Sequence, residues 1–321
     1  MEELYDCAII GGGPAGLSAA VYMGRFLRKT VVIDDAQGRS TYAQVNDNYL
    51  GFPDGLPIKQ LRALGEQQAA KFGVEFFRSC VRHLKREGEN FVAECGERSI
   101  RAKTVILCTG VRDIWPDIPD VERYVGRSLF WCIVCDGFRT AGKRIVLLGR
   151  DDDAAVTATQ FLAYTEKITF VAPPGELDCS EAKLKALEEH GIDLLEGAPD
   201  HLEGAPDHVR ALLLRDGRRL ECDLIFSLFG SDPDVGLATE VGAELTSKGY
   251  VRIDIDGYTT VPGFFCAGDV SGIHTQQVAS AVHEGAEAAM TANYYLYANY
   301  QRLEYGTPEE HVRRVLSHRR A

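Results

Sequence analysis

The chain lacks a long uninterrupted apolar run, and its first ten residues, MEELYDCAII, carry acidic residues where a secretory signal peptide carries positive charge. We therefore expect neither export nor a membrane span, and predict a cytoplasmic protein without a membrane partner. Basic residues are also in the minority, with 35 Lys and Arg against 47 Asp and Glu and a formal net charge of −12. Because nucleic acids are bound through positive charge, this composition argues against nucleic acid as a partner.

Paired cysteines are equally scarce. Most of the nine cysteines stand alone in apolar runs, such as Cys7 in DCAII, Cys108 in TVILCTG and Cys266 in FFCAGD, as is typical of small buried thiols. Only Cys132 and Cys135 form a close C-x-x-C pair. No second C-x-x-C or paired-histidine motif completes four zinc ligands, so we predict a redox pair and no metal site.

What the chain does contain begins with a dinucleotide-binding pattern in its first 35 residues. An apolar strand over residues 7–10 runs into G-x-G-x-x-G and a helix over residues 14–27, and a second strand over residues 30–33 ends at an acid. Such glycines let the backbone approach a pyrophosphate at the helix start, and the acid is placed to accept from a ribose hydroxyl. The expected binding residues are Gly11, Gly13, Pro14, Ala15, Gly16 and Asp34.

Two later segments indicate that this dinucleotide is FAD. TVILCTG, residues 104–110, and GFFCAGDV, residues 263–270, resemble the strand-and-glycine signatures of flavoproteins with two dinucleotide folds. The resemblance implies that Asp269 meets the ribityl chain of FAD, and Asn48 in NDNYLGFPDG matches a flavin-contacting asparagine of the same family. The further FAD-binding positions implied are Thr109, Gly110, Gly268, Gln277 and Val278.

The redox chemistry is expected in WCIVCDGF, residues 131–138. Together with the flavin segments, this motif resembles the low-molecular-weight thioredoxin reductases, and the resemblance covers nearly the whole chain. Two cysteines at this spacing can close a short disulfide at a helix start, where the dipole stabilises a reactive thiolate. The resemblance implies that Cys132 attacks the partner's disulfide, that Cys135 faces the flavin and resolves the mixed disulfide, and that Asp136 shuttles the proton.

The order of these motifs predicts an α/β fold with two Rossmann-like domains, the second inserted in the first. Residues 1–113 and 245–321 are expected to form the FAD-binding domain, and residues 114–244 the inserted domain that carries the C-x-x-C pair. In the resembled family the inserted domain also holds NADPH, and the enzyme is a homodimer, so we expect a homodimer here.

The motifs for that second nucleotide are degraded in LLGRDDDAAV, residues 147–156. Gly149 survives, Asp151 stands where the second glycine belongs, and Ala154 replaces the third. A carboxylate about 5 Å from a phosphate costs roughly 3 kcal/mol at an effective dielectric near 20, so we expect the aspartates to occupy the anion site and cap the helix. The run APPGELD, residues 172–178, lacks the arginines that hold a 2′-phosphate, and Gln276 replaces the family's Arg in the R-Q motif.

Retained flavin and C-x-x-C motifs with lost nucleotide motifs resemble the pyridine-nucleotide-independent branch, the ferredoxin-dependent flavin thioredoxin reductases and diflavin-linked disulfide oxidoreductases. We therefore expect a flavoenzyme that reduces a protein disulfide, on a thioredoxin-like partner, with electrons from ferredoxin or another non-pyridine carrier. Three alternatives stay open: a dithiol oxidase that passes electrons to oxygen, an enzyme with a second FAD in the altered site, and a non-enzymatic flavin-bound redox sensor.

Two further segments carry minor hypotheses. T-P-E-E, residues 307–310, begins a helix whose end gathers basic residues, either a solvated helix end or a docking patch for an acidic carrier. LEGAPDHLEGAPDH, residues 195–208, is a perfect seven-residue duplication, and its Gly-Ala-Pro-Asp cores predict paired turns between short strands rather than a metal site.

Overall fold

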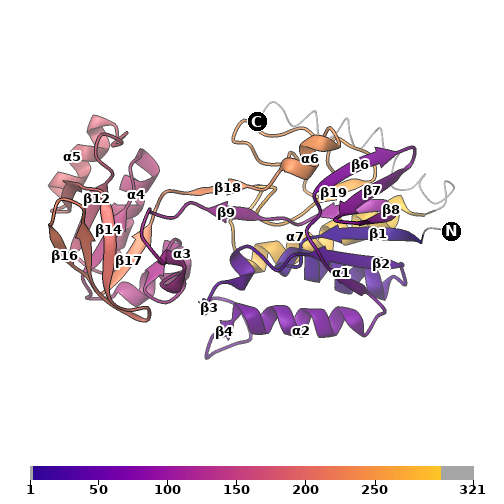
Figure 1. The fold of residues 1–321 in the computed structure, drawn as a ribbon, viewed down its shortest axis with the longest axis horizontal. Coiled ribbons are helices and arrows are strands. Elements are labelled where there is room, and N and C mark those ends of the chain that lie inside the picture. The colour runs from indigo at the N-terminus through magenta and orange to yellow at the C-terminus, as the bar shows by residue number, and fades with distance from the viewer. Residues whose placement is uncertain (1–2, 298–321) are drawn as a thin grey trace. The chain divides into compact units, whose positions relative to one another are not determined.

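The computed structural model describes residues 3–297 and divides them into two compact units (Figure 1). The first unit comprises residues up to Thr41, Ile58–Arg112 and the chain from Pro233 onward, and the second comprises Tyr42–Pro57 and Asp113–Asp232. Each unit is built around a sheet with parallel strands and helices, which confirms the predicted α/β fold with two Rossmann-like domains. The basic segment at residues 307–321 lies outside the described residues.

The first unit is organised on a seven-stranded sheet of order β5-β2-β1-β8-β7-β6, with β19 paired to β8. Strands β5, β2, β1, β8 and β19 run parallel, whereas β7 is antiparallel to β8 and to β6. The strands are β1 (Leu4–Ile10), β2 (Thr30–Asp34), β5 (Glu75–Arg78), β6 (His83–Glu87), β7 (Asn90–Cys95), β8 (Arg98–Leu107), β9 (Val111–Asp113) and β19 (Phe264–Cys266). The helices are α1 (Pro14–Arg25), η1 (Arg39–Thr41), α2 (Ile58–Ala70), α6 (Gly236–Glu240) and α7 (Val278–Tyr295).

Both faces of this sheet are buried, which is why its central strands are continuous apolar runs rather than alternating ones. One face packs with α1 and α7 around Cys7, Ile9 and Ile106. The opposite face packs around Ala8, Val105 and apolar residues between Val235 and Val270. Small residues bring α1 and α7 together, because a Cβ at Gly285 would collide with the carbonyl oxygen of Ala15. The first turn of α1, directly after the glycine loop, therefore lies against α7.

The second unit holds a five-stranded parallel sheet of order β10-β17-β11-β12-β13 and a three-stranded antiparallel sheet of order β14-β15-β16. Its strands are β3 (Val45–Asn46), β4 (Leu56–Pro57), β10 (Leu129–Phe130), β11 (Ile145–Leu148), β12 (Ile168–Ala172), β13 (Asp193–Glu196), β14 (Pro199–Ala205), β15 (His208–Leu214), β16 (Arg219–Glu221), β17 (Leu224–Ser227) and β18 (Ser231–Pro233). Its helices are η2 (Val121–Arg123), α3 (Ile133–Asp136), η3 (Gly137–Thr140), α4 (Asp152–Gln160), η4 (Phe161–Ala163) and α5 (Glu181–Glu189).

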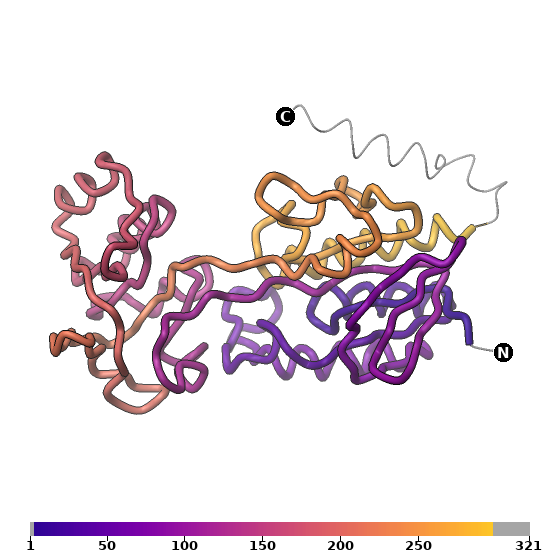
Figure 2. Tube along the Cα trace, turned by 45° about the horizontal axis from the view of Figure 1, so that its top comes forward, coloured from indigo at the N-terminus to yellow at the C-terminus, as the bar shows by residue number. Residues whose placement is uncertain are grey.

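The compact units divide the chain at residues that differ from the predicted boundaries. The sequence predicts residues 233–244 in the inserted domain, but Leu237, Ala238 and Ala243 bury their side chains in a core of the first unit. Residues 42–57, predicted in the FAD-binding domain, belong to the second unit. The chain leaves the first unit through β9 and returns through β18, and these two strands pair with each other (Figure 2).

Two sequence expectations, the burial of the single cysteines and the turns of the duplication, can be compared directly with the structure. Cys7, Cys108 and Cys266 are buried, as predicted from their apolar surroundings. The seven-residue duplication does not form paired turns as predicted: its first copy enters β14, and only its second copy makes the turn between β14 and β15. Over residues 3–297, no helix combines the length and the apolarity that a membrane crossing requires.

Candidate redox and dinucleotide site

The C-x-x-C pair forms a disulfide at the start of α3, in the second unit. Cys132 is the N-cap residue, and its sulfur accepts a hydrogen bond of 3.1 Å from the backbone N–H of Cys135. The two Cα atoms are 5.3 Å apart. An N–H donor directed at a sulfur stabilises the thiolate when the disulfide opens, so the geometry favours Cys132 as the charged sulfur of the reduced pair.

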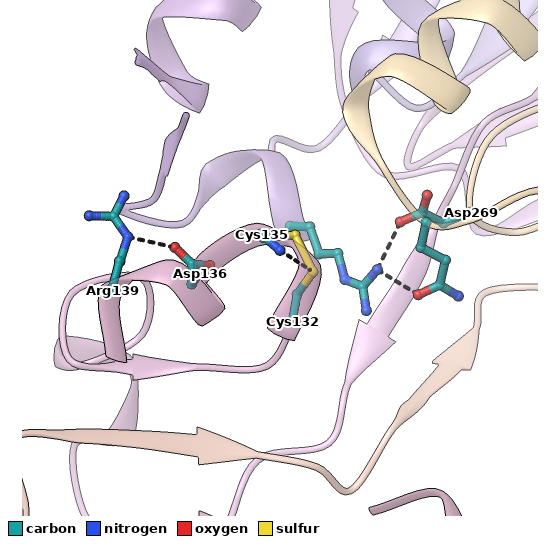
Figure 3. Close-up of a disulfide and its surroundings, with 7 residues drawn as sticks. Cys132, Cys135, Asp136, Arg139 and Asp269 are labelled. Carbon is teal, nitrogen blue, oxygen red and sulfur yellow. Dashed lines mark hydrogen bonds and ion pairs between the residues drawn. A yellow bond between two sulfur atoms is a disulfide. The ribbon is translucent and has the colours of Figure 1, made fainter. Parts of the chain in front are cut away.

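Asp136 follows the disulfide and is buried, with 7% of its side chain exposed. Its Oδ1 accepts a hydrogen bond of 2.8 Å from Nε of Arg139 (Figure 3). Arg139 also donates through Nη2 to the carboxylate of Asp47. Burial raises the pKa of Asp136 to about 6, while Arg139 draws that pKa down and the carboxylate of Asp47 pushes it up. A carboxyl group with this pKa can give and take a proton near neutral pH.

The glycine motif in the first unit forms a tight cradle at the start of α1. Gly11 has φ +105°, and a Cβ there would collide with the carbonyl oxygen of Cys108, whereas a Cβ at Gly16 would collide with the carbonyl oxygen of Gly11. At Gly13 the nearest atom to such a Cβ would be Oγ of Ser40 at 3.8 Å, so this side of the loop is open. Gly13 is also the N-cap of α1, and no side chain caps that helix end. The cradle fits the pyrophosphate of FAD.

Asp34 holds this cradle in place from the end of β2. Its Oδ1 accepts from the backbone N–H of Gly12 at 2.9 Å, and its Oδ2 accepts from Arg62 at 2.6 Å and Arg78 at 2.8 Å. Only 6% of its side chain is exposed. The carboxylate thus ties the glycine loop to two cations, which fixes the loop before any ligand arrives. Its predicted contact with a ribose hydroxyl stays a prediction.

A second cluster in the first unit joins the G-D motif to the start of α7. Nη1 of Arg39 donates to Oδ2 of Asp269 at 2.9 Å and to Oε1 of Gln276 at 2.7 Å (Figure 3). The backbone N–H of Gly268 donates to the buried carboxylate of Glu284 at 2.9 Å. Arg39 therefore brings a positive charge to Gln276, the position where the R-Q motif of the resembled family carries its own arginine.

The remaining predicted flavin residues have the following places. Thr109 donates from Oγ1 to the carbonyl oxygen of Asp234 at 2.7 Å, and the carbonyl of Gly110 accepts from the N–H of Asp234 at 3.1 Å, so both hold the returning chain. Gln277 is the N-cap of α7, and Val278 is the first residue of that helix. Asn48 is exposed in the loop between β3 and β4 of the second unit. Their contacts with a flavin stay predictions.

The equivalent helix start in the second unit is closed. Asp151 is the N-cap of α4, and its Oδ1 accepts from the backbone N–H of Ala154 at 2.9 Å. Asp152 and Asp153 add two more carboxylates in the first helical turn. The predicted capping of this helix by an aspartate is therefore present, and the N–H group that would face a pyrophosphate already has an acidic partner.

The loop after β12 closes over the same segment. Oδ1 of Asp152 accepts from the N–H of Ser180 at 2.7 Å, and the N–H of Asp178 donates to the carbonyl of Arg150 at 2.7 Å. The guanidinium of Arg150 donates to Glu176 at 2.8 Å. At the positions where NADPH-using enzymes carry the basic residues for a 2′-phosphate, this chain has acidic side chains and backbone groups.

Several residues of these clusters were not identified from the sequence, among them Arg39, Asp47 and Arg139. Arg139 could have been found, because it lies three residues after Asp136 and such a pair shares one helix face. Arg39 and Asp47 reach their partners across 230 and 92 positions of the chain, and no local pattern marks such contacts.

Comparison with known proteins agrees with this architecture. Residues 5–287 match the family model described as "Pyridine nucleotide-disulphide oxidoreductase". Thioredoxin reductase of Treponema pallidum is 30% identical over 304 residues, covering 92% of this chain and 98% of that protein, and thioredoxin reductase of Aquifex aeolicus is 30% identical over 308 residues, covering 92% and 94%.

A solved structure extends the similarity to three dimensions. The crystal structure of thioredoxin reductase from Streptococcus pyogenes MGAS5005 superposes with a TM-score of 0.85 at 26% identity, covering 92% of this chain and 99% of that one. The residues matched by the family model, 5–287, include the glycine cradle and the disulfide. The chain therefore belongs to the pyridine nucleotide-disulphide oxidoreductase family, as a thioredoxin reductase-like disulfide oxidoreductase among FAD-binding flavoproteins.

Proposed function

We propose that this protein reduces the disulfide of a thioredoxin-like protein through Cys132 and Cys135, with electrons from ferredoxin or a similar non-pyridine carrier. The observation that carries the choice of donor is the Asp151 cap on α4, described above. The protein substrate is supported by the exposed apolar side chains of Val134 and Phe138 on either side of Cys135, which offer a surface to a partner. We also propose that the enzyme is a cytoplasmic homodimer, as the resembled family implies.

The thiol chemistry balances with the groups of this chain. The Cys132 thiolate attacks the partner disulfide, one partner sulfur leaves, and that sulfur takes the proton of Asp136. Asp136 then accepts the proton of the Cys135 thiol, and the Cys135 thiolate attacks Cys132 in the mixed disulfide. The second partner sulfur leaves and takes that proton, so the partner gains two electrons and two protons while the enzyme pair becomes the disulfide. FAD, when bound, would convert single electrons from the carrier into the pair that a disulfide takes.

Ferredoxin is also a sufficient reductant. The reduction potential of a plant-type ferredoxin, about −400 mV, lies roughly 130 mV below that of a thioredoxin-like disulfide, about −270 mV. For two electrons this difference corresponds to about 6 kcal/mol. The reaction is therefore downhill without a pyridine nucleotide.

The test is an anaerobic titration of the purified holoenzyme, followed by the flavin absorbance. Reduced ferredoxin should bleach the flavin within the mixing time or shortly after, and NADPH and NADH at millimolar concentration should leave it oxidised. Prompt bleaching by NADPH would remove the proposed donor. A thioredoxin-like disulfide added after ferredoxin should restore the oxidised spectrum, and the Cys132→Ser variant should not respond to it.

A dithiol oxidase is the second candidate that the closed α4 favours, because it also needs no nucleotide. It would consume oxygen and form peroxide when a small dithiol is added to the aerobic enzyme. A second FAD in the altered site is disfavoured, since its pyrophosphate would meet the same carboxylate of Asp151 that disfavours NADPH. The ratio of released FAD to protein after denaturation measures this directly, with one FAD per chain expected.

A further inference from the structure

We propose that Arg139 is a positioning residue for proton transfer, because its guanidinium is shared between the buried carboxylate of Asp136 and the carboxylate of Asp47. This inference rests on the proposed function, in which Asp136 carries the proton between the two cysteines and the partner. It concerns how this chain sets the proton affinity of that carboxyl group.

The geometry fixes the guanidinium between the two acids. Nε donates to Oδ1 of Asp136 at 2.8 Å, and Nη2 donates to Oδ2 of Asp47, which reaches it from the loop after β3. The guanidinium carbon also lies 5.0 Å from the ring centroid of Phe138 and 5.8 Å from that of Phe130. Two acids and two aromatic rings thus restrict the side chain, which is 30% exposed. A guanidinium held in this way presents a fixed charge to Asp136.

The position of the Arg139 guanidinium between the two acids affects the proton affinity of Asp136. Burial favours the protonated form of Asp136, which gives a proton more readily than it takes one back. The guanidinium of Arg139 favours the ionised form, which takes a proton more readily than it gives one. Sharing the same cation with Asp47 sets an intermediate proton affinity, in agreement with the pKa of about 6 for Asp136. A proton shuttle needs both directions.

The charged groups that act on Asp136 are few. Among the described residues they are Arg139 from η3 and Asp47 from the β3–β4 loop, beside the cysteine pair on α3 itself. An uncharged contact comes from the η4 side, where the Tyr164 ring lies against the backbone of Gly137. The proton affinity of Asp136 therefore has one control of each sign, and the two can be removed separately.

The experiment measures the titration of Asp136 directly in the oxidised holoenzyme. Aspartate labelled with ¹³C at the carboxyl carbon is incorporated, the resonance of Asp136 is assigned by its loss in Asp136→Asn, and its chemical shift is followed with pH. Arg139→Met should raise the midpoint by about one pH unit, because the favourable cation is removed. Asp47→Asn should lower it by roughly half a unit, because a like charge is removed and the guanidinium is no longer shared. Arg139→Lys should lie between Arg139→Met and the wild type.

Opposite signs distinguish positioning from simple structural support. A merely structural pair would lose stability in both variants without moving the midpoint in opposite directions. A shift of the same sign in both variants, or no shift in either, overturns the inference. Arg215→Met is the matched control, since Arg215 pairs with Asp117 in the same unit and both are exposed, and it should leave the midpoint unchanged.

A second readout connects the titration to thiol chemistry. Enzyme reduced with dithiothreitol is mixed with a thioredoxin disulfide, and the pH dependence of its reoxidation should move in the same directions as the midpoint in each variant. If the wild type fails to reduce any disulfide, the proposed function has failed, while the carboxyl titration still decides whether Arg139 and Asp47 control Asp136. Titration midpoints that move while the pH dependence of reoxidation stays fixed would overturn the assignment of Arg139 to proton transfer.

Discussion

Gly13 and Asp151 occupy the same position at the starts of two helices, and they give those helices opposite properties. Gly13 is the N-cap of α1 and carries no side chain, so the helix end stays available to a phosphate. Asp151 is the N-cap of α4 and accepts the N–H of Ala154, so an anionic group already satisfies that helix end. We therefore propose that the residue type at the N-cap determines which unit can accept a pyrophosphate.

Substitution of Asp151 separates charge from bulk. Asp151→Asn keeps the capping oxygen but removes the charge, and should tighten NADPH binding by about tenfold. Asp151→Gly removes both and should tighten it further, since the open side of the loop then resembles that at Gly13. Affinity is measured by calorimetry with NADPH on the holoenzyme. Equal, undetectable binding in the wild type and both variants would show that this carboxylate is not what excludes the nucleotide.

In the first unit, Arg39 is the charged residue whose replacement we expect to change dinucleotide binding. Its ion pair with Asp269 places a cation beside the G-D motif, in the unit that we expect to bind FAD and its two phosphate charges. Arg39→Met removes that cation and should weaken FAD binding about tenfold, as expected for loss of one hydrogen-bonded charge, whereas Arg39→Lys should retain most of the affinity. The dissociation constant is obtained from the fluorescence of released FAD. Unchanged affinity in Arg39→Met would contradict this role.

At the scale of elements, the two copies of LEGAPDH show what a local pattern can and cannot predict. Residues 195–201 leave β13 and enter β14, while the identical residues 202–208 continue β14 and turn into β15. Gly204 has φ +115°, a conformation that favours glycine, whereas Gly197 is absent from the residues with positive φ. Identical sequences therefore have identical propensities but different structures, because their neighbours in the sheet differ.

The duplication offers an internal control for a stability prediction. At Gly204 an added Cβ would collide with the backbone carbonyl of His208, and the positive φ would also be strained. At Gly197 it would meet the flexible end of the Leu214 side chain, which can move. Gly204→Ala should therefore lower the free energy of unfolding by roughly 1–3 kcal/mol, and Gly197→Ala by clearly less. Urea denaturation followed by tryptophan fluorescence measures both, and equal losses would contradict the prediction.

The strand, glycine loop and helix of residues 7–34 were predictable because their signals are local, whereas the structure of the duplication depends on its neighbours in the sheet. In residues 7–34 every signal is local: an apolar run, three spaced glycines and an acid at the end of the next strand. The structure reproduces these elements as β1, α1 and β2, with α1 ending two residues earlier than expected at Arg25. The Asp151 cap was equally local. By contrast, the Asp47–Arg139 and Arg39–Asp269 pairs depend on chain folding between distant positions and left no signal in the sequence.

At the scale of the whole molecule, the net charge of −12 opposes the approach of an acidic electron carrier. This repulsion acts over about 10 Å at 0.1 M salt and is screened as salt rises. The proposed function therefore requires either slow association or a local basic surface. Four arginines of the chain, Arg313, Arg314, Arg319 and Arg320, are concentrated within eight residues of the sequence and are the strongest candidate for such a surface.

Replacing these four arginines with glutamine tests their role against net charge alone. The variant should be reduced by ferredoxin about tenfold more slowly than the wild type at low ionic strength, and the difference should largely vanish in 0.5 M salt. The matched control replaces Arg210, Arg215, Arg218 and Arg219, which are exposed in the second unit and change the net charge by the same amount. Stopped-flow flavin bleaching measures the rates, and dithiothreitol, which is uncharged, should react equally with all three proteins. Because the two variants have the same net charge, equal slowing would assign the effect to overall repulsion, whereas slowing confined to the first variant would assign the carrier's docking site to residues 313–320.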